Sequence, residues 1–514
     1  MSKVRIFALG GLDEDGKNML VVEVDEKIFI IEAGLKYPDS ETLGVEFIIP
    51  DFTYLIQNKE RVKAIFITHA HDDVDAALPY LLKQINVPVY TGGMTSLMVR
   101  EMLKREGVKN ARVHRIKRND TIRIAGVKVH TFPMTHAFPD NFGVAIASDQ
   151  GYIVYTGEFI IDYDMMQEEY NCDLNLLSEF GKKGVLALMC ESQGVERNGH
   201  TSPNHRITHL IEPIIESHRD GRILISTYFQ SLFRILISTY FQSLFRIQEI
   251  LDIAIKYRKK IYIHDDGLLH VLKLMEEMKY YHAPKELLVD RRNFSNAMED
   301  VLVIISGQGK NLFRTMSNIA NQEDRYVRFR SSDTIIIASP IVSGTQMDAN
   351  NMENEIYKEG GTIFSLDSRQ VLSMHPSRED LKMMLYLFKP KYYIPVKGEY
   401  RHLYMNATLA MDMGNSTNNI LVLDNGQVAE FADGEIVSTA QHLPLTDTTK
   451  GLLNEEAFAQ MKEGVRIVNF ARDALVEETA LLAALAQGKV AAYVTDFASE
   501  ALLTQENVII TPHL

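Results

Sequence analysis

The chain has 514 residues, a net charge of −14 and two cysteines. This length exceeds what one hydrophobic core supports, so we expect roughly two to four domains. No run approaches about 20 apolar residues, which argues against a membrane span, and the N-terminus lacks the apolar core of a signal peptide. Two isolated cysteines argue against a disulfide scaffold and a thiolate zinc site. We therefore expect a cytoplasmic enzyme or enzyme-like protein.

The acidic charge argues mildly against a protein that wraps nucleic acid by bulk electrostatics. Residues 100–118 nevertheless contain eight Lys or Arg residues, which is enough to line a local groove. The alternative, which we favour, is a solvated helix face.

Residues 1–202 alternate between strand and helix patterns. Residues 21–24 and 27–31 suit a hairpin, 62–67 a buried strand and 75–84 a helix, with further strands at 127–132 and 152–155. Short loops between mixed elements predict a layered α/β architecture.

Residues 203–345 alternate in longer units and predict a second α/β domain with a parallel sheet. Strand patterns return at 334–338 and 392–396, and Ser377 opens a helix with the spacing of a capping box. Within this region residues 222–233 are followed at once by an identical copy, residues 234–245. One copy fits a strand followed by a helix, so we expect local disorder or strain where the other must be accommodated.

A histidine cluster follows the strand pattern at 62–67. In the segment THAHDDV (68–74), alternation lets His69, His71 and Asp73 point the same way. His136 and Glu158 also follow strands. Imidazole and carboxylate at three strand ends predict a zinc or manganese site, and ordinary surface histidines are the alternative for the first segment alone.

The succession of these residues resembles the metallo-β-lactamase superfamily and, within it, the β-CASP nucleases of the ribonuclease J type. Further segments resemble that family in the same order along the chain, over about 85% of it. These are ALGGLDEDGKN (8–18), LGVEFIIPD (43–51), ERNG (196–199), SGQG (306–309) and FKPKYYIPVKGEYR (388–401).

The resemblance implies a metallo-β-lactamase αββα sandwich with an inserted β-CASP α/β domain. The expected parts are a first metallo-β-lactamase segment (1–202), the β-CASP domain (203–345) and a return segment (346–438). The family activity is metal-dependent cleavage of RNA, internally and from the 5′ end, with two metals at the scissile phosphate.

The sequence departs from the family pattern at several site positions. The final histidine of HxHxDH is Val74, the bridging aspartate is Glu158, and the late histidine of PVHGEY is Lys397. In addition, HVSGH appears as VLSMH (371–375), SNIHR as QSLFR (242–246), and the early strand-end aspartate as Glu32.

The departures fall mainly on one metal position. By the resemblance, one ion uses His69, His71, His136 and Glu158, which all remain capable ligands. The other uses Asp73, Glu158 and the positions of Val74 and Lys397. We therefore expect one ion at most, zinc or manganese, with Lys397 in place of the second cation and paired with Asp73 and Glu158.

The same resemblance implies catalytic roles for Asp73 and Glu158. It also implies contacts to RNA or phosphate for Glu191, Ser373, His375 and Lys397. Ordinary surface or core roles are an equal alternative for Glu191 and His375.

Residues 441–514 have a different texture and resemble the distal half of the NAD-binding domain of D-3-phosphoglycerate dehydrogenase. Arg472 and His513 match that family's substrate-binding arginine and catalytic histidine. The segment lacks the GxGxxG turn and the acidic residue that bind a dinucleotide, so we expect a partial Rossmann-like unit without NAD. We interpret it as a fusion in place of the family's C-terminal domain.

The leading interpretation is a ribonuclease J-like RNA-degrading metallo-hydrolase with weak or lost activity. The alternatives are a non-catalytic RNA-binding or regulatory partner of an active ribonuclease J, a metallo-β-lactamase-fold hydrolase of small molecules and, from the tail alone, a 2-hydroxyacid dehydrogenase. Expected partners are RNA and a ribonuclease J paralogue or a second copy, as a dimer or tetramer weakened by the altered C-terminus.

Overall fold

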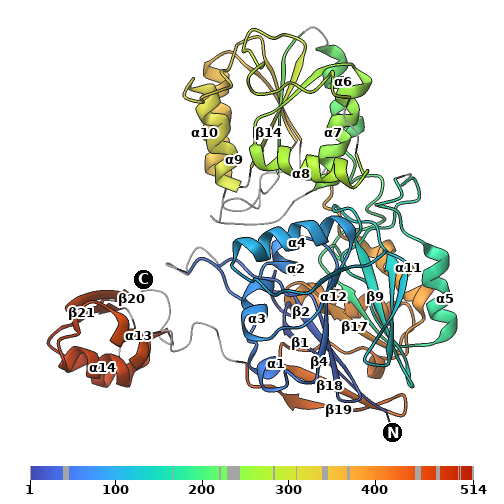
Figure 1. Cartoon of the computed structure of the whole chain (residues 1–514), viewed down its shortest axis with the longest axis vertical. Helices are drawn as coiled ribbons and strands as arrows, with labels where there is room; N and C mark the ends of the chain where they lie inside the picture. Colours follow the sequence, from blue (N-terminus) through green and yellow to red (C-terminus); the bar gives the residue numbers. More distant parts are fainter. Residues whose placement is uncertain are drawn as a thin grey trace.

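The computed structural model describes residues 2–511 except 39–44, 166, 219–220, 229–242, 282–283, 308, 339–344, 367–370, 446–452, 470–474, 496 and 498. Figure 1 shows a two-sheet body, a second body of helices around a sheet, and a small C-terminal unit. No helix among the described residues is long and apolar enough to cross a membrane.

The two-sheet body contains an eight-stranded and a six-stranded sheet. The first has the order β19 (Glu435–His442), β18 (Gln427–Ala432), β1 (Lys3–Gly10), β2 (Met19–Val24), β3 (Lys27–Ile31), β4 (Val62–Ile67), β5 (Val89–Thr91) and β6 (Val113–Arg115). The second has the order β17 (Tyr392–Val396), β11 (Val185–Glu191), β10 (Gly151–Tyr155), β9 (Phe142–Ser148), β8 (Val127–Pro133) and β7 (Asp120–Ile124).

One core fills the space between these sheets, where Phe29 and Phe66 of the first meet Val144 and Met189 of the second. Each outer face carries helices, because alternate apolar side chains of both sheets also point outward. The helices are α1 (Thr53–Gln57), α2 (Asp72–Asp75), α3 (Leu78–Gln84) and α4 (Gly93–Arg105) with the first sheet, and α5 (Leu174–Lys183), α11 (Arg378–Phe388) and α12 (Tyr400–Asp412) with the second; a 3₁₀ turn covers Thr417–Asn419. The αββα sandwich is therefore confirmed.

The inserted domain has a five-stranded parallel sheet between two groups of helices. Its strands are, in order, β13 (Lys260–Ile263), β14 (Val301–Gly307), β12 (Ile223–Tyr228), β15 (Thr334–Ile337) and β16 (Thr362–Ser365). Its helices are α6 (Thr208–Ser217), α7 (Leu244–Lys256) and α8 (Asp266–Glu277) on one face, and α9 (Gly309–Ala320) and α10 (Gln346–Lys358) on the other. Buried Arg222 is paired with Asp333 beside this sheet.

Two sequence-based expectations need correction here. The inserted domain does not end at residue 345, because α10 is the crossover helix that brings β16 into parallel pairing with β15. The helix expected at 75–84 is divided into α2 and α3, with Pro79 in the first turn of α3, where its missing N–H costs nothing. The capping box at Ser377 is confirmed.

The repeated segment is only partly described. The first copy supplies β12 and the end of the second copy begins α7. The expected disorder or strain falls on 229–242, outside the described residues.

The C-terminal unit contains a three-stranded parallel sheet of β20 (Val465–Asn469), β21 (Val490–Thr495) and β22 (Val508–Ile510). It also contains α13 (Glu455–Gln460), α14 (Glu478–Ala486) and α15 (Glu500–Leu503), which enclose a small core. Arg472 and His513 lie outside the described residues. The expected start of this unit, near 438–441, falls inside β19, which still pairs with β18.

Gly34 packs closely against the main chain of the loop that carries His69, His71 and Asp73. A Cβ at Gly34 would overlap the main-chain carbonyl of Asp73. We predict that Gly34→Ala destabilises the two-sheet body by about 3 kcal/mol, because the Asp73 loop must move to relieve the overlap. Denaturant unfolding measures this, with Gly221→Ala as the control, since its Cβ would meet only ordinary contacts. Equal midpoints for the two variants would contradict the close approach.

Candidate metal centre

Loops that follow strands of both sheets bring four potential ligands together. His69 and His71 follow β4, His136 follows β8 and Glu158 follows β10. One ligand atom from each lies within 4.8 Å of the others. Tetrahedral zinc with bonds near 2.1 Å needs donors roughly 3.4 Å apart, so small side-chain shifts suffice to close this set around an ion.

A hydroxyl relay sets the tautomer of His69. Thr68 Oγ donates to Glu32 Oε1 at 2.7 Å and lies 2.9 Å from His69 Nδ1. When Glu32 is ionised, it takes the single hydrogen of the hydroxyl, so Thr68 accepts from Nδ1–H and the lone pair of His69 lies on Nε2, 2.9 Å from His71 Nδ1. Burial raises the pKa of Glu32 to about 8, and burial and the neighbouring His71 lower the pKa of His69 well below its ordinary value.

The tautomer of His136 is set by a main-chain carbonyl. Its Nδ1 donates to the Met374 carbonyl at 2.9 Å, which leaves the lone pair on Nε2. Burial lowers the pKa of His136 well below its ordinary value, so the ring is neutral. Its buried Nε2 makes no hydrogen bond among the described residues and lies 3.2 Å from Glu158 Oε2. A lone pair facing a carboxylate at this distance is the arrangement that a cation between them stabilises, so these residues fit a divalent ion.

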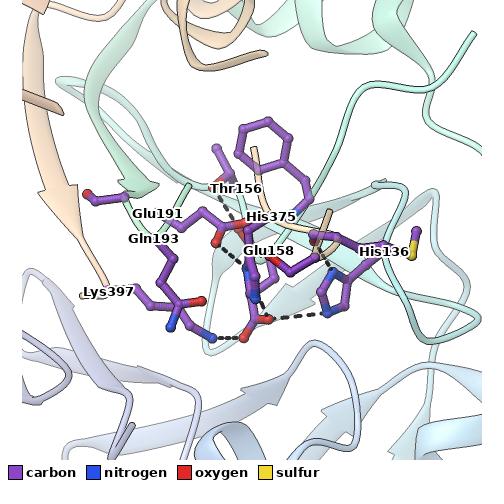
Figure 2. Close-up of polar contacts among 12 residues, drawn as sticks. His136, Thr156, Glu158, Glu191, Gln193, His375 and Lys397 are labelled. Atoms are coloured by element: carbon purple, nitrogen blue, oxygen red, sulfur yellow. Dashed lines mark hydrogen bonds and ion pairs between the residues drawn. The ribbon is translucent and has the colours of Figure 1, made fainter. Parts of the chain in front are cut away.

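An ammonium group occupies the other side of Glu158. Lys397 Nζ lies 2.7 Å from Asp73 Oδ2 and makes an ion pair with Glu158 Oε1. Figure 2 shows Lys397 and His136 approaching the Glu158 carboxylate from opposite sides. Burial alone would raise the pKa of Asp73, but Lys397 and His71 together outweigh it and lower that pKa. Asp73 is therefore an anion held by Lys397.

Val74, which stands where the family has a histidine, is 1% exposed and packs in the apolar core. Lys397 adopts a left-handed backbone with φ of +59°, followed by Gly398 at +131°. This turn after β17 aims the lysine side chain across the site.

Glu191 and His375 form a second polar pair beside this centre. His375 Nδ1 lies 2.8 Å from Glu191 Oε2 and 3.8 Å from Glu158 Oε2. Burial raises the pKa of Glu191, which His375 partly offsets. The Ser373 hydroxyl is further away in this network and accepts from Arg197 at 3.1 Å.

Two supporting residues were not singled out from the sequence. Asn18 donates to both Asp73 Oδ2 and the Asp73 carbonyl at 2.9 Å, and Arg197 donates to the Ser373–His375 loop. Both lie in segments that resemble the family, and that was the only signal for them.

The basic stretch at 100–118 is used partly for structure. Arg100, Arg112 and Arg118 donate to the carbonyls of Val113, Asn86 and Asn141. The exposed remainder is Lys104, Arg105, Lys109, Arg115 and Lys117.

Family models match four stretches of the chain. They are the beta-lactamase superfamily domain at 46–206, the ribonuclease J beta-CASP domain at 233–356, the Zn-dependent metallo-hydrolase RNA specificity domain at 369–422, and the NAD-binding domain of D-isomer specific 2-hydroxyacid dehydrogenases at 428–514. The last match begins within β18, which belongs to the eight-stranded sheet, and it contains no GxGxxG turn.

Curated relatives match over most of the chain. Ribonuclease J 2 from Staphylococcus epidermidis is 32% identical over 436 residues, covering 84% of this chain and 76% of the relative, and ribonuclease J 2 from Staphylococcus aureus is 30% identical over the same span. A crystal structure of a protein of unknown function from Enterococcus faecalis matches in fold with a TM-score of 0.55 at 14% identity, over 84% of this chain and 100% of that one. By the extent and identity of these matches, the chain belongs to the ribonuclease J family.

Proposed function

We propose that this protein is an RNA-binding hydrolase of the ribonuclease J type that holds one divalent ion, zinc or manganese, and has weak or no nuclease activity. The ligands of the ion are His69, His71, His136 and Glu158. The ammonium of Lys397 stands in for the second cation. One observation carries the proposal: Lys397 Nζ bridges Asp73 and Glu158, two carboxylates by which the family would hold a second ion.

The charge of the site supports this assignment. The buried carboxylate of Glu158 and the largely buried one of Asp73 need compensating charge, because an unpaired buried anion is strongly destabilising. A monocation supplies half the charge of a divalent ion and no open coordination position. It therefore satisfies Asp73 and Glu158 without the chemistry of a second metal.

The remaining residues define what the site can do. A divalent ion bound by the three histidines supplies Lewis acidity toward a phosphoryl oxygen. Asp73 and Glu158 are the residues placed to assist hydrolysis, yet both are engaged by Lys397, so neither is free to accept a proton from water. His375 uses Nδ1 for Glu191 and keeps Nε2 for an RNA phosphate, and Ser373, Glu191 and Lys397 line the same RNA-binding region.

A non-catalytic role as partner of an active ribonuclease J, or of a second copy, is the alternative supported by the same lysine. The dehydrogenase match carries no function, because its dinucleotide-binding half is missing from the matched stretch.

We predict one zinc or manganese ion per chain after metal loading and gel filtration, measured by elemental analysis. His136→Ala removes a ligand and should weaken binding by more than the roughly 100-fold that loss of a supporting partner costs. His114→Ala, an exposed histidine on β6, is the control. Two ions per wild-type chain would disprove the single-ion proposal.

We predict that Lys397→Met destabilises the metal-free protein by about 3–5 kcal/mol, because Asp73 and Glu158 lose their buried counter-charge. Lys391→Met is matched to it, since Lys391 pairs with Glu435 at the surface and should cost no more than about 1 kcal/mol. Urea unfolding in chelator measures both. Similar losses for the two variants would refute the role of Lys397.

We predict that 5′-monophosphorylated RNA is bound but shortened at least about 100-fold more slowly than by a two-metal ribonuclease assayed in parallel, since one charge-stabilising partner of the scissile phosphate is missing. Gel-resolved time courses with added zinc or manganese measure the rate, and filter binding measures affinity. Residual processive shortening, lost in His136→Ala, supports the weak enzyme. Binding with no shortening supports the partner subunit, and failure to bind RNA contradicts both.

A further inference from the structure

Arg197 lies in the loop after β11 and touches none of the four proposed ligands. Its guanidinium instead donates three hydrogen bonds to one short loop, residues 373–375. Nη1 donates to the Ser373 carbonyl at 3.0 Å and to the Ser373 hydroxyl at 3.1 Å, and Nη2 donates to the His375 carbonyl. Three donations from one planar group fix both the position and the tilt of the loop.

The residue between these anchors is Met374, whose carbonyl accepts from His136 Nδ1. The next residue, His375, contacts Glu191. A guanidinium that holds the carbonyls of residues 373 and 375 therefore sets where the carbonyl of residue 374 points. That carbonyl decides which nitrogen of His136 carries the lone pair for a metal.

The surroundings of Arg197 leave it little freedom. A side chain at Gly194 would overlap the guanidinium and the Pro376 carbonyl. Thr201 Oγ1 donates to the same His375 carbonyl at 2.7 Å, and Arg378 N donates to the Arg197 carbonyl at 3.0 Å. The loop is thus held from the 194–201 segment by two side chains, of which Arg197 makes most of the contacts.

We infer that Arg197 is a positioning residue for the metal centre: by clamping the Ser373–His375 loop it presents the Met374 carbonyl to His136 and so fixes His136 Nε2 as a ligand. This inference rests on the proposed metal site and names a residue that controls it from outside the ligand set.

The test is cobalt binding by the full-length chain, because Co²⁺ replaces zinc in such sites and its visible spectrum reports ligand geometry. Arg197→Gln should keep the fold, by far-ultraviolet circular dichroism, yet bind Co²⁺ about ten- to a hundredfold more weakly with an altered spectrum. Arg197→Lys, which keeps one strong donor, should fall between Arg197→Gln and the wild type.

Arg222→Gln is the matched control. Arg222 is another buried arginine with several donations, to Asp333, Asn296 and the Arg328 carbonyl, but it lies in the inserted domain. The Arg222→Gln substitution should lower the thermal midpoint of unfolding and leave the Co²⁺ affinity and spectrum of the folded protein unchanged. If Arg197→Gln does not fold, Arg197→Lys and Thr201→Val carry the same comparison.

Wild-type affinity and spectrum in the Arg197 variants would overturn the inference while leaving the metal site standing. An equal loss of Co²⁺ affinity in Arg222→Gln would also overturn it, since general destabilisation would then explain the effect. Failure of the wild-type chain to bind Co²⁺ would remove the proposed metal site and the inference together.

Discussion

The ammonium of Lys397 lies between Asp73 and Glu158, and the surrounding structure is arranged around that contact. Asp73 is held in turn by Asn18, and Glu158 faces the neutral ring of His136 on its other side. Without a cation the buried carboxylate of Glu158 and the largely buried one of Asp73 would have no compensating charge, which is strongly destabilising. The lysine therefore satisfies a charge requirement of the fold as well as altering the chemistry of the site.

The same carboxylate of Glu158 divides the centre into two unlike halves. On one side lie three histidines; burial lowers the pKa of His69 and of His136, whose Nδ1 atoms face Thr68 and the Met374 carbonyl. On the other side the ammonium of Lys397 lies between the two carboxylates that, by the family resemblance, would hold a second metal. With the proposed single ion, the site would polarise a phosphate but would lack a second cation to activate water and stabilise the leaving oxygen.

The ribonuclease J matches and the dehydrogenase match cover different parts of the structure. The beta-lactamase and RNA-specificity matches, at 46–206 and 369–422, contain β4 to β6 of the first sheet and all six strands of the second. They also contain His69, His71, Asp73, His136, Glu158 and Lys397. The dehydrogenase match contains a small parallel sheet with its own core, β20 to β22, and none of its described residues belongs to the candidate metal cluster. The proposed function therefore rests on the two-sheet body and the inserted domain.

Much of the fold followed from the sequence, because alternation and apolar runs mark strands such as β4 and β17 whatever their neighbours. The four candidate ligands that the structure brings together, His69, His71, His136 and Glu158, were also predicted from the sequence, since each follows such a strand. The end of the inserted domain could not be predicted from the sequence, because only the parallel pairing of β16 with β15 shows that β16 belongs to this domain. The contact of Lys397 with Asp73, 324 residues away along the chain, was predicted only through the family resemblance, and no sequence pattern indicated that Arg197 holds the loop that orients His136. Those contacts depend on side-chain directions set by packing two sheets together, and only the tertiary structure decides them.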